Sequence, residues 1–488
     1  MGEWNPGRNP SRKPVMADAL TPAQLDGLKA LAGPGGWSDD PERLAPKLVE
    51  WRDRWMGSTP LLLLPRTAAE VSALIGYCAD QGIAVIPQGG NTGLVGGQIP
   101  TGEVLLSLER MRAIRDVDTV DDVLVAEAGV PLAEVQAAAA AAGRFFPLSL
   151  ASEGTATIGG LCSTNAGGTA VLRYGTMRNL VLGIEAVLPD GQVIHGLKRL
   201  RKDNTGYDLK HLLIGAEGTL GVITAVSLKL FPVLNSRAVA FIGLDSPEDA
   251  LKLLTLAKAE SGGAVEAFEL MARLGIEVTI KNIPGMREPL DGDHPWYVLT
   301  ELASAEPGHA EAALERTLEK GFELGLARDA TIAQNQTQAA AFWALRENHS
   351  AAQKPEGKSW KQDVSVPVSK VPELLSLATA AVEAFSPGVR VMAFGHVGDG
   401  NIHFNVMQPN QGDFDALGET HQNNRDAGAQ VVHDIVHSLG GSISAEHGLG
   451  TMKTVEALRY KSAAEVAAMR AIRAALDPKR IMNPRVLF

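Results

Sequence analysis

Two glycine-dense segments, residues 88–97 and 154–168, constrain the fold of this chain more than any other feature. The first segment follows a β-α-β pattern, with apolar strands expected at 61–65 and 83–87 and a helix expected at 68–81. Glycine lets backbone N–H groups approach and converge on a diphosphate without side-chain bulk. The alternative is that the glycines only serve tight turns, which explains one such loop better than two in one domain.

The common nucleotide-binding motifs are missing from the sequence. Neither Gly-x-Gly-x-x-Gly nor Gly-x-x-x-x-Gly-Lys-Ser/Thr occurs anywhere in the chain. A Rossmann fold and a P-loop are therefore not supported. If these loops bind a dinucleotide, they do so through another architecture.

Composition limits the remaining classes of protein. A chain of 488 residues is too long to fold around one ordinary hydrophobic core, so more than one domain is expected. The formal charge of -11 argues against a nucleic-acid or anionic-membrane partner. Apolar runs such as 61–64 are far too short to span a bilayer, so no transmembrane segment is expected. Two cysteines cannot form a disulfide framework, and we expect a cytoplasmic protein.

The pattern of elements predicts an α+β protein with four segments. The first is a polar leader and helical segment without a secretory signal, because no apolar run follows Arg8, Arg12 and Lys13. Met16 is a candidate start. The further helices are expected at 133–143, 247–261, 309–326, 336–354 and 463–476, and the further strands at 180–188 and 220–230. The segments are 1–55, 56–233 (first domain), 234–460 (second, α+β domain with an antiparallel sheet) and 461–488 (return to the first domain).

A hairpin that carries two histidines is expected at 389–406. An apolar, β-prone run is followed by the turn signal Asp399-Gly400, after which the strand resumes. A two-residue turn there places His396 directly opposite His403, with Cβ atoms about 5 Å apart. Two imidazoles at that separation can hold one metal ion.

The motif Ala445-Glu446-His447-Gly448 offers a third ligand. Two histidines and one glutamate with an open fourth position is one form of catalytic zinc site. Consecutive side chains on an extended backbone point to opposite sides, so we expect Glu446 on the metal and His447 as a general base. The alternative, an ordinary polar group at a strand end, explains any one histidine better than it explains the whole set.

Seven motifs occur in the order in which one flavoprotein family carries them. They are Pro87-Gln-Gly-Gly-Asn-Thr-Gly93, Thr157-Ile-Gly-Gly160, Ser163-Thr-Asn-Ala-Gly-Gly168, Gly215-Ala-Glu-Gly-Thr-Leu-Gly221, the hairpin from Gly395 to Asn405, Ala445-Glu-His-Gly448 and Ile481-Met-Asn-Pro484. The chain resembles the vanillyl-alcohol oxidase (PCMH) type of FAD-binding oxidoreductases, over nearly all of its length after about residue 55. Within that type it resembles the group of D-2-hydroxyglutarate dehydrogenase, D-lactate dehydrogenase and the glycolate oxidase FAD subunit.

The resemblance implies an FAD-binding domain of two subdomains at 56–233 and a cap domain at 234–460 that brings substrate to the flavin. The residues implied to bind FAD are Pro87, Gln88, Gly89, Gly90, Asn91, Thr92, Gly93, Pro147, Ser152, Gly154, Thr157, Ile158, Gly159, Gly160, Ser163, Asn165, Gly167, Glu217, Gly218, Gly221, Ile223 and Asn483. Some relatives bond flavin covalently to a histidine in the first loop. Asn91 stands in that neighbourhood here, so non-covalent FAD is expected.

Two positions depart from the family pattern. Leu161 follows Gly160 where relatives often have asparagine, and Arg485 follows Pro484 where glycine is usual. Each position touches a contact otherwise implied for flavin binding. We therefore assign no role to either residue from the resemblance.

The resemblance also implies that Arg346, Ser350, Lys361, Asn405 and His447 contact the substrate. Arg346 and Ser350 are four apart on the expected helix and so share a face, and Lys361 begins a strand-like run. A guanidinium, a hydroxyl and an ammonium group together can fix a carboxylate. The alternative is an exposed helix face with no ligand.

Together these features indicate an FAD- and metal-dependent dehydrogenase of D-2-hydroxy acids, with D-2-hydroxyglutarate as first candidate. The C2 hydrogen would leave as hydride to flavin N5, and His447 would take the hydroxyl proton. Zinc is the divalent metal that the ligands favour. The alternatives are a D-lactate dehydrogenase, a glycolate oxidase FAD subunit that works only inside a membrane-associated complex, and a zinc hydrolase. The electron acceptor is expected to be an electron-transfer flavoprotein, a quinone or a cytochrome, and a homodimer is left open.

Overall fold

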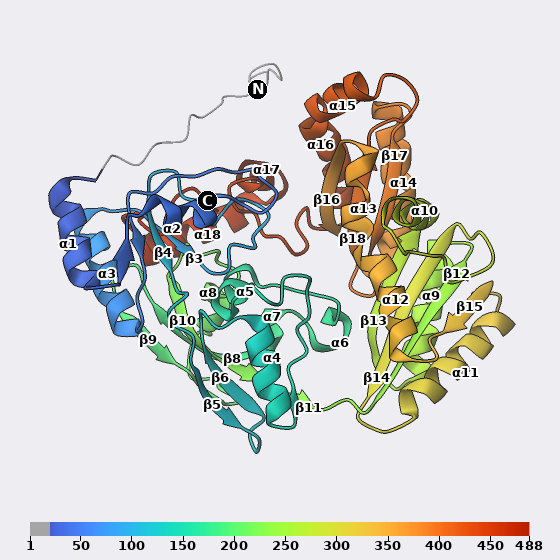
Figure 1. The fold of residues 1–488 in the computed structure, drawn as a ribbon, viewed down its shortest axis with the longest axis horizontal. Coiled ribbons are helices and arrows are strands. Elements are labelled where there is room, and N and C mark those ends of the chain that lie inside the picture. The colour runs from blue at the N-terminus through green and yellow to red at the C-terminus, as the bar shows by residue number, and fades with distance from the viewer. Residues whose placement is uncertain (1–19, 488) are drawn as a thin grey trace.

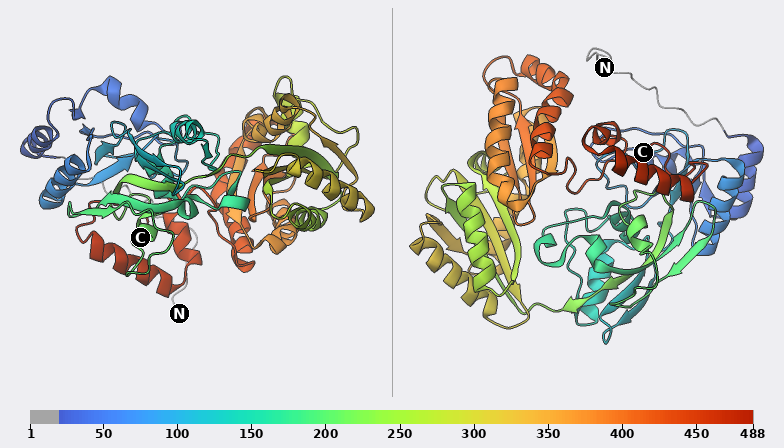
Figure 2. Two further views of the ribbon diagram at one scale, coloured as in Figure 1. Left: turned by 90° about the horizontal axis from the view of Figure 1, so that it is seen from below. Right: turned by 180° about the vertical axis from the view of Figure 1, so that it is seen from behind.

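The computed structural model describes residues 20–487, so the expected leader and Met16 lie outside the described residues. The chain forms two lobes that face each other (Figure 1). The first lobe contains residues 20–232 and also receives the C-terminal helices, which follow the second lobe in sequence. Both views in Figure 2 place those C-terminal helices on the first lobe.

The first lobe contains two main sheets, which correspond to the two expected subdomains. The first sheet has the order β1 (Trp37–Ser38), β2 (Leu62–Leu63), β4 (Val104–Ser107) and β3 (Val85–Gln88). The second sheet is antiparallel, with the order β5 (Ile114–Asp118), β6 (Val123–Glu127), β10 (Val222–Lys229), β8 (Val181–Val187) and β9 (Val193–Gly196). A short pair, β7 (Arg144–Phe145) and β11 (Phe231–Pro232), lies where the chain leaves this lobe.

The expected β-α-β unit is present, and its helix α3 spans Ala68–Gln81 as predicted. Thr67 caps the helix by accepting the N–H of Glu70 at 3.1 Å, and Gly82 ends it in the left-handed conformation. One detail differs, because β2 and β3 are not neighbours: β4 pairs in parallel with both of them. The first glycine-dense loop leaves β3 at the edge of this sheet.

The helices of the first lobe are mostly short. They are α1 (Pro22–Ala32), α2 (Pro41–Leu48), α4 (Leu132–Ala141), α5 (Ile158–Thr164), α6 (Val171–Tyr174), α7 (Met177–Leu180) and α8 (Lys210–Leu213). The predicted alanine-rich helix is α4, and the predicted helical first segment contains α1 and α2. The second glycine-dense loop forms α5, which packs on the core under β10 and β6.

The second lobe is one seven-stranded antiparallel sheet with helices on both faces, as expected for the cap domain. Its order is β15 (Asp329–Ile332), β12 (Ser236–Leu244), β14 (Trp296–Ser304), β13 (Val265–Ala272), β17 (Arg390–His396), β18 (Asn401–Met407) and β16 (Ser359–Ser365). One apolar core includes α9 (Pro247–Glu260), α11 (His309–Glu323), α14 (Val371–Phe385) and α16 (Arg425–Ser438), which α15 (Phe414–Asn423) precedes. The opposite core includes α10 (Arg273–Asn282), α12 (Gln336–Glu347) and α13 (His349–Ala352).

The helix predicted at 336–354 is broken in the structure. After α12 ends at Glu347, the side chain of Asn348 donates a hydrogen bond to the carbonyl of Ala344, and α13 begins at the next residue. Polar side chains that bond nearby backbone groups compete with a continuous helix. A 3₁₀ turn, η1 (Lys354–Glu356), follows. Arg346 and Ser350 therefore belong to different helices.

The chain crosses back to the first lobe between Ser442 and the C-terminal helices α17 (Thr454–Tyr460) and α18 (Ala463–Leu476). Backbone N–H groups of Leu449 and Gly450 already bond a side chain of the first lobe. Helix α18 has the predicted bounds, and Ser462 caps it through a capping box. Among residues 20–487, no helix combines the length and the apolar character that a membrane crossing requires.

Candidate active site

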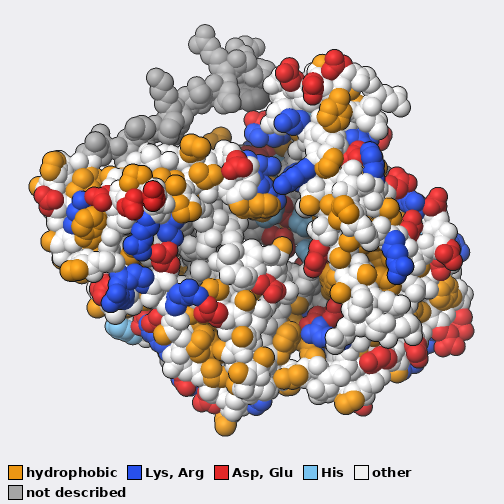
Figure 3. Space-filling view, viewed as in Figure 1, with side chains coloured by type: hydrophobic (Ala, Val, Ile, Leu, Met, Phe, Trp, Pro, Cys, Tyr) orange, Lys and Arg blue, Asp and Glu red, His pale blue; other side chains and the backbone are white. Residues whose placement is uncertain are grey.

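A cavity of about 1600 Å³ lies between the two lobes. Both glycine-dense loops line it from the first lobe, and side chains of β17, β18 and α12 line it from the second. Figure 3 shows a hollow between the lobes with histidine side chains visible inside it. Most residues implied for the cofactor thus share this space with three of those implied for the substrate, Arg346, Ser350 and His447.

All the residues implied to bind FAD line this cavity, except Ile158 and Asn165. Ile158 is fully buried in the apolar core beneath its loop. Asn165 adopts a left-handed conformation and accepts the N–H of Arg178 through its carboxamide at 2.9 Å. These two residues do not line the cavity, because a motif gives the position of a residue but not the direction of its side chain.

The two glycine-dense loops pack directly against each other. A Cβ atom on Gly90 would lie 1.9 Å from the carbonyl oxygen of Thr155, and one on Gly89 would lie 2.4 Å from Thr157 Oγ1. Such distances are possible only without side chains, so glycine is required here for close approach. The loops form one continuous wall of the cavity.

Polar groups in this wall are free to bind a cofactor. Three buried polar atoms of cavity-lining residues make no hydrogen bond to any residue in 20–487: Gln88 Oε1, Thr157 Oγ1 and Asn483 Oδ1. Buried polar atoms are usually satisfied, so their position indicates a polar ligand. The wall therefore fits a dinucleotide.

Asn91 is held by the end of α2 and the residue that follows it, between β1 and β2. Its Nδ2 atom donates to the carbonyl oxygens of Pro46 at 3.2 Å and Val49 at 2.9 Å, and its φ of 55° places it in the left-handed region. A carboxamide is not a nucleophile that bonds flavin. Non-covalent binding of FAD stays a prediction.

Glu217 makes contacts with the returning chain that its motif did not reveal. Its carboxylate accepts the N–H groups of Leu449 at 2.9 Å and Gly450 at 2.8 Å, just after the Glu446-His447 loop. Burial raises the pKa of Glu217 in spite of these bonds. The residue therefore fastens the returning chain to the first lobe.

Arg485, left unassigned from the sequence, has a structural partner. Its Nε atom lies 2.7 Å from the buried carboxylate of Glu103, and a second nitrogen donates to the carbonyl of Ile99. The arginine at this departure from the family pattern thus neutralises a buried acid. Leu161, the other departure, lines the cavity with an apolar side chain.

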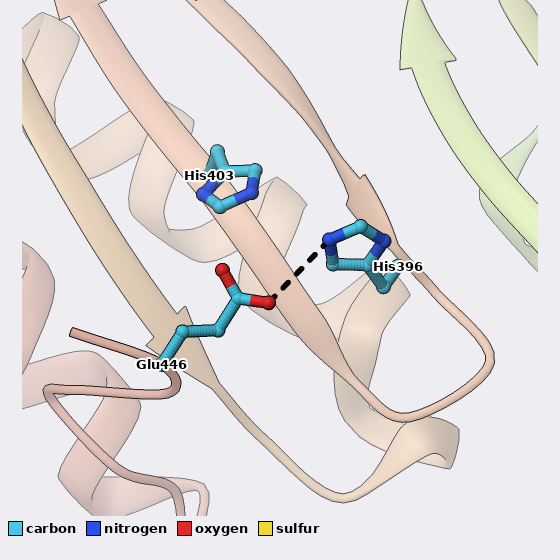
Figure 4. Close-up of side chains that lie close together, drawn as sticks. All are labelled: His396, His403 and Glu446. Carbon is cyan, nitrogen blue, oxygen red and sulfur yellow. Dashed lines mark ion pairs between the residues drawn. The ribbon is translucent and has the colours of Figure 1, made fainter. Parts of the chain in front are cut away.

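His396, His403 and Glu446 converge in the wall of the cavity (Figure 4). Each offers one ligand atom, and these atoms all lie within 4.8 Å of one another. The two imidazole centroids are 5.7 Å apart, and His396 Nε2 lies 3.6 Å from Glu446 Oε1. The cluster predicted from two motifs more than forty residues apart is present.

The register of the hairpin differs from the prediction by two residues. Phe394, rather than His396, lies opposite His403, and a four-residue turn joins β17 to β18. The turn is fixed by Asp399, which accepts the N–H of Asn401, and by pairing of Asn401 with Ser365 of β16. Because side chains alternate with a period of two, a shift of two keeps both histidines on one face.

Glu269 on β13 contacts two of the predicted site residues, which the sequence did not reveal. Its carboxylate lies 2.6 Å from His396 Nδ1 and 2.7 Å from Arg346 Nη2. Burial raises the pKa of Glu269, but His396 and Arg346 outweigh burial and lower it to about 2. Glu269 therefore directs the other nitrogen of His396 toward Glu446.

Asp363 on β16 was also missed. This buried carboxylate accepts the backbone N–H groups of Glu446 at 3.0 Å and His447 at 3.1 Å, and it lies 3.3 Å from His447 Nδ1. It also lies opposite His403 in the sheet. Burial raises its pKa, but the neighbouring His447 and His403 lower it further than burial raises it. The sequence pattern that could have pointed to Asp363 was an acidic residue inside a strand-like run.

The residues that the resemblance implies for substrate binding line two connected spaces. Ser350, Lys361, Asn405 and His447 line a compartment of about 80 Å³ that shares several walls with the large cavity. Lys361 Nζ donates to the carbonyl of Ser350 at 3.2 Å. Arg346 instead lines the large cavity, where Glu269 and the ring of Phe394 hold it.

Two sequence-family models match the chain. The model described as "FAD binding domain" matches residues 59–196, and the model described as "FAD linked oxidases, C-terminal domain" matches residues 234–487. The second match alone covers more than half of the chain. Both lobes are therefore those of one flavoprotein family, as the resemblance predicted.

Curated relatives match almost the full length of the chain. The D-2-hydroxyglutarate dehydrogenase of Arabidopsis thaliana is 38% identical over 97% of this chain and 82% of its own length. The D-2-hydroxyglutarate dehydrogenase of Danio rerio is 38% identical over 98% of this chain and 87% of its own. Both are named as mitochondrial, which contradicts the cytoplasmic location expected from cysteine content. A low cysteine count distinguishes oxidising from reducing compartments but not one reducing compartment from another.

Solved structures share the fold at low sequence identity. p-Cresol methylhydroxylase with bound substrate matches with a TM-score of 0.74 at 14% identity, over 97% of this chain and 99% of that chain. Alkyldihydroxyacetonephosphate synthase matches with a TM-score of 0.70 at 17% identity, over 97% and 86%. These structures confirm the predicted PCMH-type fold. From its two domain matches and its relatives, the chain belongs to the family of FAD-linked oxidases.

Proposed function

We propose that this enzyme oxidises a D-2-hydroxy acid to the 2-oxo acid with FAD as oxidant, and that D-2-hydroxyglutarate is its substrate. The observation that carries the proposal is His447, which Asp363 holds in the wall that also contains the His396-His403-Glu446 cluster. The names of the Arabidopsis thaliana and Danio rerio relatives support the choice of substrate.

The cluster fits a divalent metal ion. Two imidazoles and one carboxylate that leave an open position are the donors of a catalytic zinc site. Burial raises the pKa of Glu446 to about 7, although His396 opposes this rise. Burial makes the charged form of this carboxylate unfavourable, and a cation bound beside it would stabilise that form. A bound divalent ion would polarise the substrate hydroxyl and lower its pKa.

His447 is the general base in this proposal. Its Nδ1 atom faces Asp363, which favours the tautomer with the proton on Nδ1 and leaves Nε2 free. Burial lowers the pKa of His447, although Asp363 opposes this effect. A neutral imidazole can accept the hydroxyl proton of the substrate. Bound FAD would supply the oxidation by accepting the C2 hydrogen as hydride at N5.

Side chains around His447 would orient the substrate. Asn405 and Lys361 face each other across β18 and β16, and both line the small compartment beside His447. Ammonium and carboxamide groups bind carboxylate oxygens through charge-assisted or neutral hydrogen bonds. Arg346 would act mainly through Glu269 and His396, because Glu269 already occupies its guanidinium. The oxidant of the reduced flavin is proposed only as a class: an electron-transfer flavoprotein, a quinone or a cytochrome.

Anaerobic flavin reduction tests the proposal. The purified yellow protein is mixed with D-2-hydroxyglutarate, D-malate or D-lactate, and the flavin absorbance at about 450 nm is followed. Rapid bleaching by the D but not the L enantiomer of 2-hydroxyglutarate is expected. A flavin that none of these acids reduces would contradict the proposed function, and a protein without flavin absorbance would favour the hydrolase alternative.

A further inference from the structure

The small compartment beside His447 is lined by an excess of cations. Arg52 and Arg54 come from the segment between α2 and β2, Lys361 from β16 of the cap and Lys453 from the returning C-terminal chain. None of the described residues that line it is acidic. Figure 3 shows Lys and Arg side chains gathered in the upper part of the hollow between the lobes. Three distant parts of the chain thus bring positive charge to one place.

Glu50 acts electrostatically on both arginines, but its carboxylate pairs with neither guanidinium. Neither guanidinium forms a hydrogen bond or an ion pair with any residue in 20–487, and that of Arg52 lies 4.9 Å from the ring centroid of Trp51. The nearby Glu50 carboxylate is directed to the backbone instead, where it accepts the N–H groups of Arg52 at 3.0 Å and Arg54 at 3.4 Å. The arginine side chains are therefore available to a ligand.

The other cations of this region are already engaged. Arg346 pairs with Glu269, and Lys453 donates to the carbonyl of Ile443 at 2.7 Å. Burial and, to a smaller extent, the charges of Arg52 and Arg54 together lower the pKa of Lys361 to about 8. Like charges that are desolvated together destabilise one another, and an anion between them removes that cost.

We infer that Arg52 and Arg54 are specificity-determining residues, which bind the distal carboxylate of a dicarboxylic D-2-hydroxy acid together with Lys361. This inference rests on the proposed function. The small compartment and the large cavity share His403, His447 and Ser350 in their walls. A substrate whose C2 hydroxyl lies at His447 can therefore extend its other end toward the arginines.

The charge distribution selects the chemical class of substrate. A dicarboxylate such as D-2-hydroxyglutarate places its second negative charge among unpaired cations. A monocarboxylate such as D-2-hydroxybutyrate leaves those cations unpaired and so gains less from binding. The arginines then discriminate between substrates by the distal group, while the metal cluster and His447 act on the hydroxyl group that all candidates share.

The test compares Arg52→Gln, Arg54→Gln and the double variant with wild type, using flavin reduction by D-2-hydroxyglutarate and by D-2-hydroxybutyrate. The ratio of kcat/KM for the dicarboxylate to that for the monocarboxylate is expected to fall about 10- to 100-fold, because a charge-assisted hydrogen bond is lost. Most of the fall should appear in KM. Arg52→Lys keeps the charge and should recover part of the ratio.

Arg425→Gln is the matched control for long-range electrostatics. Arg425 is close enough to influence Arg54 electrostatically, but it is exposed, pairs with Asp426 and lines neither space. Its ratio should stay within about twofold of wild type, since a screened surface charge contributes little. FAD content and melting temperature of each variant confirm that it is folded.

The outcomes separate this inference from the proposed function. Suppose that D-2-hydroxyglutarate reduces the wild-type flavin but the double arginine variant keeps the wild-type substrate ratio. That result overturns the inference alone. An equal fall of the substrate ratio in Arg425→Gln also overturns it, because the ratio then depends on the overall positive charge of the region rather than on contacts of Arg52 and Arg54. A wild-type flavin that neither acid reduces overturns the proposed function and this inference with it.

Discussion

At the scale of single residues, two buried carboxylates organise the candidate site. Asp363 bonds the backbone of Glu446 and His447 and faces the His447 ring, and Glu269 bonds His396. Each acid fixes the orientation of a side chain that the motifs had already identified. The proposed chemistry would therefore depend on residues outside the motifs.

Replacement of the proposed base is the first prediction. His447→Ala should lower the rate of flavin reduction by D-2-hydroxyglutarate about 10²- to 10⁴-fold, because general base catalysis is lost. FAD should stay bound, since the residues implied to hold it lie on other loops. Stopped-flow absorbance measures the rate. A reduction rate close to that of wild type would remove His447 from the role of base.

Glu269 gives a second prediction at this scale. Glu269→Gln keeps the size of the side chain but weakens its bonds to His396 and Arg346. Affinity for zinc should fall about 10- to 100-fold, as is typical when a partner of a metal-bound histidine is removed. Competition with a chromogenic chelator measures the affinity. Zinc affinity equal to that of wild type would show that Glu269 does not orient a ligand.

At the scale of elements, Glu356 joins three parts of the cap domain. It follows α13 in η1 and accepts hydrogen bonds from Lys281 and Asn282 at the end of α10 and from Arg390 of β17. Burial raises the pKa of Glu356, but Lys281, Asn282 and Arg390 outweigh burial and lower it to about 2. The folded protein thus favours the charged form.

The lowered pKa predicts how stability depends on pH. The stabilisation by Glu356 should be fully present above its unfolded pKa of about 4.3 and should be lost as pH falls toward 2. Glu356→Gln should therefore lower the free energy of unfolding by about 1–3 kcal/mol at pH 7 and by less at lower pH. Urea unfolding at several pH values measures both. A difference that does not change with pH would contradict this account.

Elements defined by local signals could be predicted from the sequence. Helices α3 and α18 have the predicted bounds because Thr67 and Ser462 cap them within four residues. The hairpin register could not be predicted, since Asn401 is positioned by β16, far away in the chain. The roles of Glu269 and Asp363 were missed for the same reason. Their partners His396 and His447 are brought close only by strand pairing and the return of the chain.

At the scale of the whole molecule, the site forms only where the two lobes meet. The first lobe supplies the glycine-dense wall, the cap supplies the histidines, and Glu217 fastens the loop that follows Glu446 and His447. Motif order predicted both lobes and their shared site. The return of the C-terminal segment to the first lobe was also predicted, but the crossing begins after Ser442 rather than at 461, because no local pattern marks where the chain leaves the cap.

The wall between the lobes also predicts how the cofactor is held. Asn91 occupies the neighbourhood of the covalent histidine of some relatives and bonds the carbonyl of Val49. Acid precipitation should therefore release all of the flavin as free FAD into the supernatant. A yellow pellet after precipitation would reveal a covalent bond and contradict the prediction.

The central claim is that the His396-His403-Glu446 cluster holds a metal ion that D-2-hydroxy acid oxidation requires. Stopped-flow reduction of the bound flavin by D-2-hydroxyglutarate tests this most directly, in one preparation before chelation, after chelation and after return of zinc. We predict rapid bleaching at about 450 nm, loss of at least about 100-fold in rate on chelation with FAD retained, and recovery with zinc. Bleaching at the same rate in the chelated, metal-depleted protein would contradict the account.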